Sequence, residues 1–136
     1  MKARRSWQWD EFRETARRFF TDQLHVTLDR KGRFSIDLKT WNKMKRPEAV
    51  VLLYDRDAQT IGIRPSSIEV PHAVMVRPRH ERHSKAVTSR RFFSKHRIVI
   101  EKTLEFPTAA IDDEGVLVLN LREMIAVAPR TRRAKN

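Results

Sequence analysis

Two short segments in which apolar and polar residues alternate, joined by a glycine turn, constrain the fold of this chain more than any other feature. They read HVTLD and RFSID, and they flank the turn DRKG. A period of two puts Val26 and Leu28 on the same face of a β-hairpin as Phe34 and Ile36. Gly32 suits the turn because it adopts a positive φ without the steric cost of a Cβ atom. This stretch therefore predicts paired strands.

The pattern continues through a short helix into a second pair of strands. Asp37 is expected to cap a helix over LKTWNKMK, which the following RP ends. AVVLLYD is a nearly continuous apolar strand and therefore a central one, and TIGIRP follows it after the turn RDAQ. Residues 25–65 thus give the order β-β-α-β-β. So small a unit cannot cover its own apolar faces, so a second sheet must pack against it.

The second half of the chain repeats this order in a weaker form. Residues 66–72 form a linker, and AVMVR, KAV, TLEF and VLVLNL are strand-like segments within residues 73–121. Thr88 or Ser89 is expected to cap a helix over RRFFSKH. The basic connection PRHERHS then occupies the place that DRKG has in the first half. The prediction is a duplicated unit, which rests on the order of the elements.

The two ends of the chain fall outside the duplicated region. Residues 1–24 contain SWQWDEFRETARRFF, whose aromatic residues recur at helical spacing. This predicts an amphipathic helix that covers the edge of the core, with a membrane-surface helix as the alternative. Residues 122–136 are basic, contain Pro129 and show no apolar period, which predicts a mobile tail. The expected fold class is α+β, mainly β.

The charge of the chain indicates the kind of partner to expect. The sequence has 29 Lys and Arg against 17 Asp and Glu, a formal net charge of +12. Such an excess favours nucleic acid first, an anionic membrane surface second and an acidic protein third. The chain has no cysteine and no apolar stretch long enough to span a membrane, and its N-terminus lacks the apolar segment of a signal peptide. We therefore expect a cytoplasmic, nucleoid-associated protein that is not bound to a membrane.

LDRKGRFSID resembles the hairpin and helix entry of the AbrB/MraZ/SpoVT-like DNA-binding superfamily, in which a D-x-x-G-R turn leads into an alternating strand and a short helix. AVVLLYDRDAQTIGIRP resembles that family's closing hairpin. The resemblance covers residues 25–65 clearly and residues 73–121 as a degenerate second copy. It implies a swapped-hairpin β-barrel, made from two ββαββ motifs, that binds DNA through basic residues on its hairpins. A chain with both copies is already a pseudo-dimer; if the second half is not a repeat, a symmetric homodimer is expected.

The resemblance places Arg30, Lys31 and Arg33 in the family's basic turn, and these residues are the first choice for a DNA contact. A pseudo-twofold axis is expected to bring the second basic connection beside them. Its contact residues are Arg79, Arg82 and Lys85. A β-ribbon fits the major groove, arginine binds guanine in a bidentate manner, and about six phosphate contacts predict a log–log salt slope of about −5. Further phosphate contacts are expected from the arginines of the termini, Arg4, Arg5, Arg130, Arg132 and Arg133.

The leading alternative to a DNA-binding protein, either a transcription regulator or an architectural factor, is a protein-interaction module. Such a module would be a subunit of a nucleoprotein complex or an antitoxin-like partner, with Trp7 or Trp9 as the interaction hot spot. RNA binding is less expected, because few aromatic residues fall on a predicted strand face where splayed bases stack. Competition between duplex DNA and RNA separates these two possibilities.

Neither a cofactor nor a metal nor catalysis is expected. His80 and His83 in HERH supply only two nitrogen ligands, whereas a zinc site needs at least three protein ligands. The acidic run Asp112, Asp113 and Glu114 precedes a glycine and is explained by turn chemistry. The chain also lacks a nucleophile elbow, a phosphate-binding glycine loop and an H-E-x-x-H helix, so an enzyme is not expected.

Overall fold

The computed structural model describes residues 24–79 and 84–127, and most of the regular secondary structure in these ranges belongs to two antiparallel β-sheets. The first sheet contains β1 (Val26–Leu28), β2 (Arg33–Asp37), β6 (Arg77–Pro78), β7 (Ser84–Thr88), β8 (Leu104–Glu105) and β11 (Ile125–Ala126). The second contains β3 (Ala49–Asp55), β4 (Thr60–Ser66), β5 (Val74–Met75), β9 (Ala110–Ile111) and β10 (Leu117–Asn120). The helical elements are α1 (Leu38–Lys43), α2 (Arg90–His96) and the 3₁₀ helix η1 (Leu121–Glu123). A mainly β fold of the α+β class is thereby confirmed.

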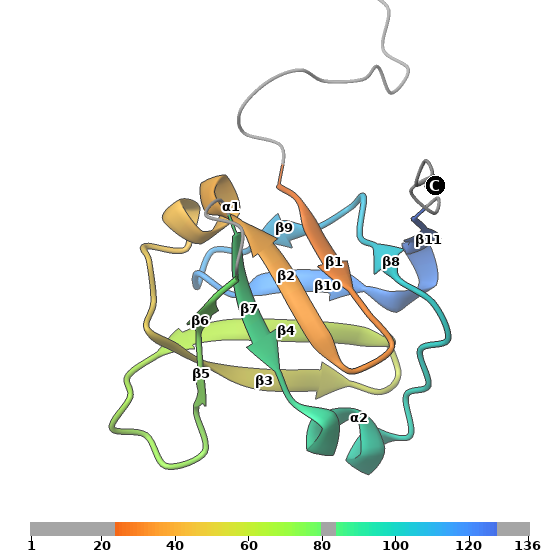
Figure 1. The fold of residues 1–136 in the computed structure, drawn as a ribbon, viewed down its shortest axis with the longest axis horizontal. Helices are drawn as coiled ribbons and strands as arrows, with labels where there is room; N and C mark the ends of the chain where they lie inside the picture. The colour runs from red at the N-terminus through yellow and green to blue at the C-terminus, as the bar shows by residue number, and fades with distance from the viewer. Residues whose placement is uncertain (1–23, 80–83, 128–136) are drawn as a thin grey trace, which may run out of the picture.

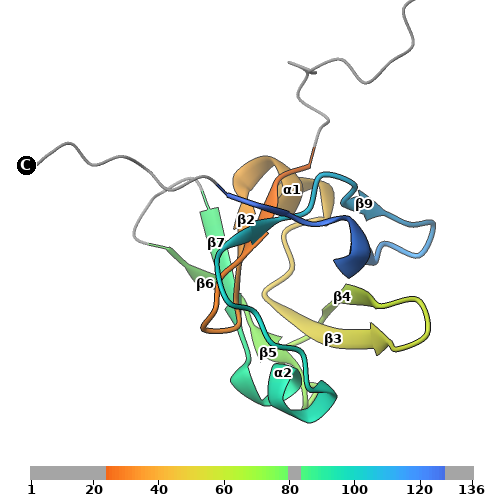
Figure 2. The ribbon, with the colours of Figure 1, turned by 90° about the vertical axis from the view of Figure 1, so that its right-hand side faces the viewer.

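The two sheets form separate layers, with the core between them (Figures 1 and 2). Their strand orders are β11-β8-β1-β2-β7-β6 and β5-β3-β4-β10-β9. Within the described residues the strands do not close into one barrel, because no ladder joins the two sheets. The helix predicted within residues 1–24 lies outside the described residues.

The strand order interleaves the two halves of the chain. β1, β2, α1, β3 and β4 follow one another, and β6, β7, α2, β9 and β10 come in the same order with β8 inserted. Each half gives one hairpin to each sheet. β2 pairs with β7 in the first sheet and β4 pairs with β10 in the second, both antiparallel. Shorter pairs also join the halves, β1 with β8 in the first sheet and β3 with β5 in the second, so the halves meet through two antiparallel pairs in each layer.

The predicted alternation of apolar and polar residues in the first hairpin is confirmed, because the apolar residues form its buried face. Val26 pairs with Ile36 and Leu28 with Phe34, and all four side chains are at most 1% exposed. Their inner face packs against a second set of fully buried apolar side chains, from β3, β4, β7 and β10: Val50, Ile61, Ile63, Val87, Leu117 and Leu119. Burial of this apolar surface from both sheets is the main force that holds the layers together.

Both helices begin at the predicted caps, each directly after a strand of the first sheet. Asp37 accepts from the backbone N–H of Thr40 at 3.0 Å, and Ser89 accepts from that of Phe92 at 3.2 Å. These bonds satisfy N–H groups that have no partner inside the helix. The Thr40 side chain is fully buried; its hydroxyl accepts from the His25 N–H at 3.0 Å and donates to Asp37. α1 is thus tied to the start of β1.

The segment AVMVR is not one strand, as the sequence predicts, but two. β5 pairs with Ala49–Val50 in the second sheet, whereas β6 pairs with Lys85–Ala86 in the first. Val76 lies between them, and its N–H donates to the carbonyl of Glu48 at 3.0 Å. The chain therefore crosses from one layer to the other within five residues, which the periodicity of a short apolar run does not reveal.

Two further expectations are corrected. β3, expected to be a central strand, lies between β5 and β4 but pairs with β5 only at Ala49 and Val50, so among the described residues the rest of that side has no strand partner. The expected basic tail does not begin at residue 122: η1 continues from β10, and Ile125–Ala126 pairs with Leu104–Glu105. Main-chain pairing needs no apolar period, so the sequence gives no sign of it. Residues 128–136 lie outside the described residues.

Candidate nucleic-acid interface

The turn between β1 and β2 is fixed by its own aspartate. Asp29 Oδ1 accepts from the backbone N–H groups of Lys31 at 2.9 Å and Arg33 at 3.2 Å. The Gly32 N–H donates to the Asp29 carbonyl at 3.0 Å, and Gly32 has a φ of +77°. The turn predicted from DRKG is therefore confirmed, with glycine at the position where a positive φ is required.

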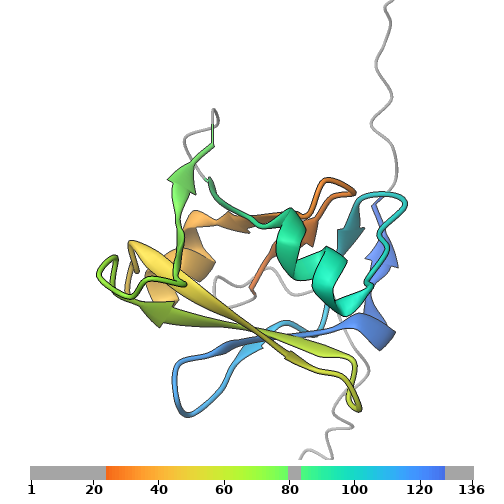
Figure 3. The same ribbon diagram turned by 90° about the horizontal axis from the view of Figure 1, so that it is seen from below.

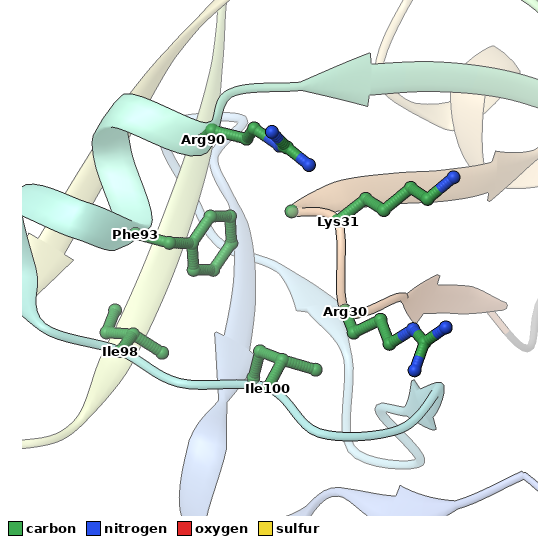
Figure 4. Close-up of a pocket in the computed structure, with 7 residues that line it drawn as sticks. Arg30, Lys31, Arg90, Phe93, Ile98 and Ile100 are labelled. Atoms are coloured by element: carbon green, nitrogen blue, oxygen red, sulfur yellow. The ribbon is translucent and has the colours of Figure 1, made fainter.

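The three cations of this turn are not equivalent. Arg33 forms an ion pair with Asp29, with Nη2 at 2.9 Å and Nε at 3.0 Å from Oδ2, and 40% of its side chain remains exposed. Arg30 and Lys31 are exposed, and Figure 4 shows their side chains running outward from the turn. Asp29 therefore neutralises part of the charge of this turn, at Arg33.

The helix of the second half supports this turn from one side. The Ser89 N–H donates to the Gly32 carbonyl at 3.1 Å, and a Cβ placed on Gly32 would lie 3.0 Å from Cδ2 of Phe93. The Phe93 ring packs in turn on Phe34, with 5.6 Å between the ring centroids. The basic turn is therefore held in one position against α2.

A second group of cations lies along β6 and β7. Arg79 donates from Nη1 to the hydroxyl of Ser35 at 2.9 Å, which holds it over β2. Lys85 Nζ lies 4.3 Å from the centroid of the Trp41 ring on α1, a cation–π contact. Arg82 lies outside the described residues.

The sequence predicts that the two groups of cations lie side by side, but in the structure they do not. In the antiparallel ladder between β2 and β7, Arg33 is opposite Thr88 and Asp37 is opposite Ser84. The turn before β2 and the chain entering β7 are therefore at opposite ends of the sheet. Figures 1 and 3 agree, since α2 lies at the end with the β1–β2 turn and α1 at the other end. The prediction fails because the twofold relation of an antiparallel pair reverses the strand direction.

One face of the first sheet connects the two ends. We call it the outer face, because its side chains point away from the buried residues Phe34, Ile36 and Val87. It includes Thr27, Arg33, Ser35 and Asp37 of the first hairpin and Arg77, Ser84, Ala86 and Thr88 of the second, with Arg79 bonded to Ser35. Beyond β1, Glu105 is opposite Thr27 and Ile125 is opposite Glu105, so these two residues belong to the same face. The face thus presents short side chains among three arginines, with the carboxylates of Asp37 and Glu105 at its borders.

Two further arginines, Arg77 and Arg90, are candidate contacts that the sequence pattern does not indicate. Arg77 is directly opposite Ala86, which is itself opposite Ser35, so it belongs to the outer face. Arg90 follows the cap Ser89 and comes close to the basic turn, since it lines the same hollow as Arg30 and Lys31. Arg77 could be assigned to the outer face from the sequence only if the pairing of β6 with β7 were already known.

The other polar clusters have structural roles or are not described. Asp112 Oδ1 accepts from the backbone N–H groups of Glu114 and Val116, both at 2.9 Å, as turn chemistry predicts. Among residues 24–79 and 84–127, no three His, Asp or Glu side chains group in a way that could hold a metal ion. His80 and His83 lie outside these ranges, as do Arg4, Arg5, Arg130, Arg132 and Arg133 of the termini.

In the part of the chain that the structure describes, no helix has both the length and the apolar character that crossing a membrane requires. No protein-family model, curated protein or solved structure matches the chain. Its function must therefore be inferred from the residues and their geometry.

Proposed function

We propose that this protein binds duplex DNA through the outer face and the basic turn of its first sheet, as a transcription regulator or an architectural factor. The observation that carries the proposal is the composition of the outer face. The short side chains on its neighbouring strands protrude little from the backbone of the sheet. Arg33, Arg77 and Arg79 lie at the borders of this flat surface. A surface of this shape lets the strands approach the groove while the guanidinium groups reach phosphates and base edges.

The dimensions of this surface suit a duplex. Along β2, from Arg33 to Asp37, the chain advances about 13 Å, at about 3.3 Å per residue. The major groove is about 12 Å wide. Cations at the two ends of β2 would therefore span the groove and contact the backbones on both of its sides. The basic turn and Arg79 both border the outer face and still serve this function, whereas Lys85, opposite Ile36, lies on the other side of the sheet.

The interleaving of the halves supports a swapped-hairpin arrangement of the AbrB/MraZ-like kind. The two halves pair with each other in both sheets, through β2 with β7 and β1 with β8 in the first and through β4 with β10 and β3 with β5 in the second. Each helix also packs on a strand of the other half: Trp41 of α1 against Lys85 of β7, and Phe93 of α2 against Phe34 of β2. This reciprocity is what two copies of one motif within a chain would produce. We therefore propose that one chain, as a monomer, forms a pseudo-dimer. A homodimer in solution would oppose this proposal.

The same face favours DNA over RNA. Among the described residues of the outer face there is no aromatic side chain on which a splayed base could stack. A flat, arginine-rich strand surface can approach the wide major groove of duplex DNA. It suits the major groove of duplex RNA less well, because that groove is deep and narrow and side chains cannot enter it. A protein with this activity would work in the cytoplasm, at the nucleoid.

Fluorescence anisotropy with a labelled duplex tests the proposal. Arg77→Gln on the outer face should weaken binding about fivefold and reduce the log–log salt slope by about 0.9 from a wild-type value of about −5. Arg64→Gln is the matched control, because Arg64 is exposed on β4 in the second sheet. It removes the same charge and should change affinity little. Equal losses in the two variants would mean that binding follows net charge and not the outer face.

A further inference from the structure

A hollow with a cavity volume of about 130 Å³ lies between the basic turn and α2. Its floor is apolar and comes from Phe93, Ile98 and Ile100, of which Phe93 and Ile100 are otherwise buried in the core. Figure 4 shows these three side chains facing the turn, while Arg30 and Lys31 run outward from it and Arg90 lies above. The hollow therefore has an apolar inner part and a cationic outer part.

The charge of the lining is of one sign. Arg30, Lys31 and Arg90 line the hollow, and among residues 24–79 and 84–127 no carboxylate does. The neighbouring cavity on the other side of the turn differs, because Asp29 and Glu101 are part of its lining. An anion is therefore attracted to the first hollow more than to the second, although the two cavities share Arg30 and Lys31.

The size of the hollow and its apolar floor indicate which group would accompany the anion in a ligand. An apolar cavity of about 150 Å³ is enough to hold one benzene ring. Cations also stabilise an aromatic ring near them, as Lys85 does at 4.3 Å from the Trp41 ring elsewhere in this molecule. A single aromatic ring would thus fit the floor, and a carboxylate attached to it would point outward to the guanidinium groups.

We infer that the hollow formed by Phe93, Ile98 and Ile100 with Arg30, Lys31 and Arg90 is a binding site for a small aromatic carboxylate of one ring. This site goes beyond the proposed DNA binding and does not depend on it, since its test uses no DNA.

The test is a titration of the full ¹⁵N-labelled chain with sodium benzoate, followed by amide chemical shifts. Benzoate is expected to bind with a Kd of about 1 mM, which is reasonable for a ligand of this size, and to shift the amides of Lys31, Gly32 and Ser89 most. Benzamide has the same shape without the charge, and acetate has the charge without the ring. Each should bind at least about tenfold more weakly.

Variants locate the site. Arg90→Gln should weaken benzoate binding about tenfold, whereas Arg91→Gln should leave it unchanged, because Arg91 is exposed on the same helix and does not line the hollow. Ile98→Phe should fill the hollow and abolish binding. If Ile98→Phe does not fold, the comparison of Arg90 with Arg91 decides alone. The inference is overturned if benzoate does not bind, if benzamide binds equally well, or if the two arginine variants behave alike.

Discussion

Replacement of Gly32 by alanine should destabilise the protein more than any other glycine change at a turn. Gly32 has a φ of +77°, a conformation that costs a residue with a Cβ atom about 1 kcal/mol. The added Cβ would also lie 3.0 Å from the Phe93 ring, which cannot withdraw freely because it packs on Phe34. Overpacking of this kind costs about 1–3 kcal/mol. The expected loss in free energy of unfolding is therefore about 2–4 kcal/mol.

Gly115 provides the matched control for this experiment. Its φ is +84°, but a Cβ there would meet nothing within 4 Å, so Gly115→Ala should cost only the backbone strain of about 1 kcal/mol. Urea unfolding of both variants, with unchanged m-values, gives the difference. Phe93→Leu combined with Gly32→Ala should recover part of the loss in a double-mutant cycle. Equal costs at the two glycines would refute the contact between the turn and α2.

Three further perturbations have expected outcomes. Thr40→Val should lower the free energy of unfolding by about 1–3 kcal/mol, because it leaves the His25 N–H without its acceptor, whereas Thr40→Ser should cost less; urea unfolding that shows the reverse order would contradict this. Asp29→Asn should tighten DNA binding in anisotropy by releasing Arg33 from its ion pair, and unchanged or weaker binding would oppose a role for Arg33. Burial, with help from nearby Lys95 and Arg56, lowers the pKa of His96, so stability that is full above the ordinary histidine pKa should be lost as pH falls through the lowered value. His96→Phe should flatten this dependence in unfolding curves at pH values from about 7.5 to about 5, and an equally steep curve in the variant would contradict it.

The features that the sequence predicts correctly are those fixed by contacts between near neighbours. The DRKG turn depends on Asp29 and Gly32, and the helix starts depend on the caps Asp37 and Ser89. Each of these interactions spans four residues or fewer, so the residue types alone indicate it. The alternation that buries Phe34 is equally local. These elements could therefore be assigned without knowing how the chain is packed.

The features that the sequence does not predict depend on pairing between distant segments. The ladder of β2 with β7 sets which end of the sheet each basic group occupies, and it joins residues about fifty positions apart. The bond from Arg79 to Ser35 and the membership of Arg77 in the outer face follow from the same ladder. Main-chain pairing of β11 with β8 leaves no signature in side chains. The candidate residues were thus partly identified, but not their arrangement.

The central claim is that duplex DNA lies on the outer face of the first sheet, and amide chemical-shift mapping with a duplex tests it directly. The account predicts that shifts concentrate on Arg30, Lys31, Ser35 and Thr88, with weak effects on the β9–β10 turn near Gly115. The β9–β10 turn serves as the reference because it belongs to the second sheet. Shifts that cluster on β3, β4 and the Gly115 turn, with the outer face unaffected, would contradict the account.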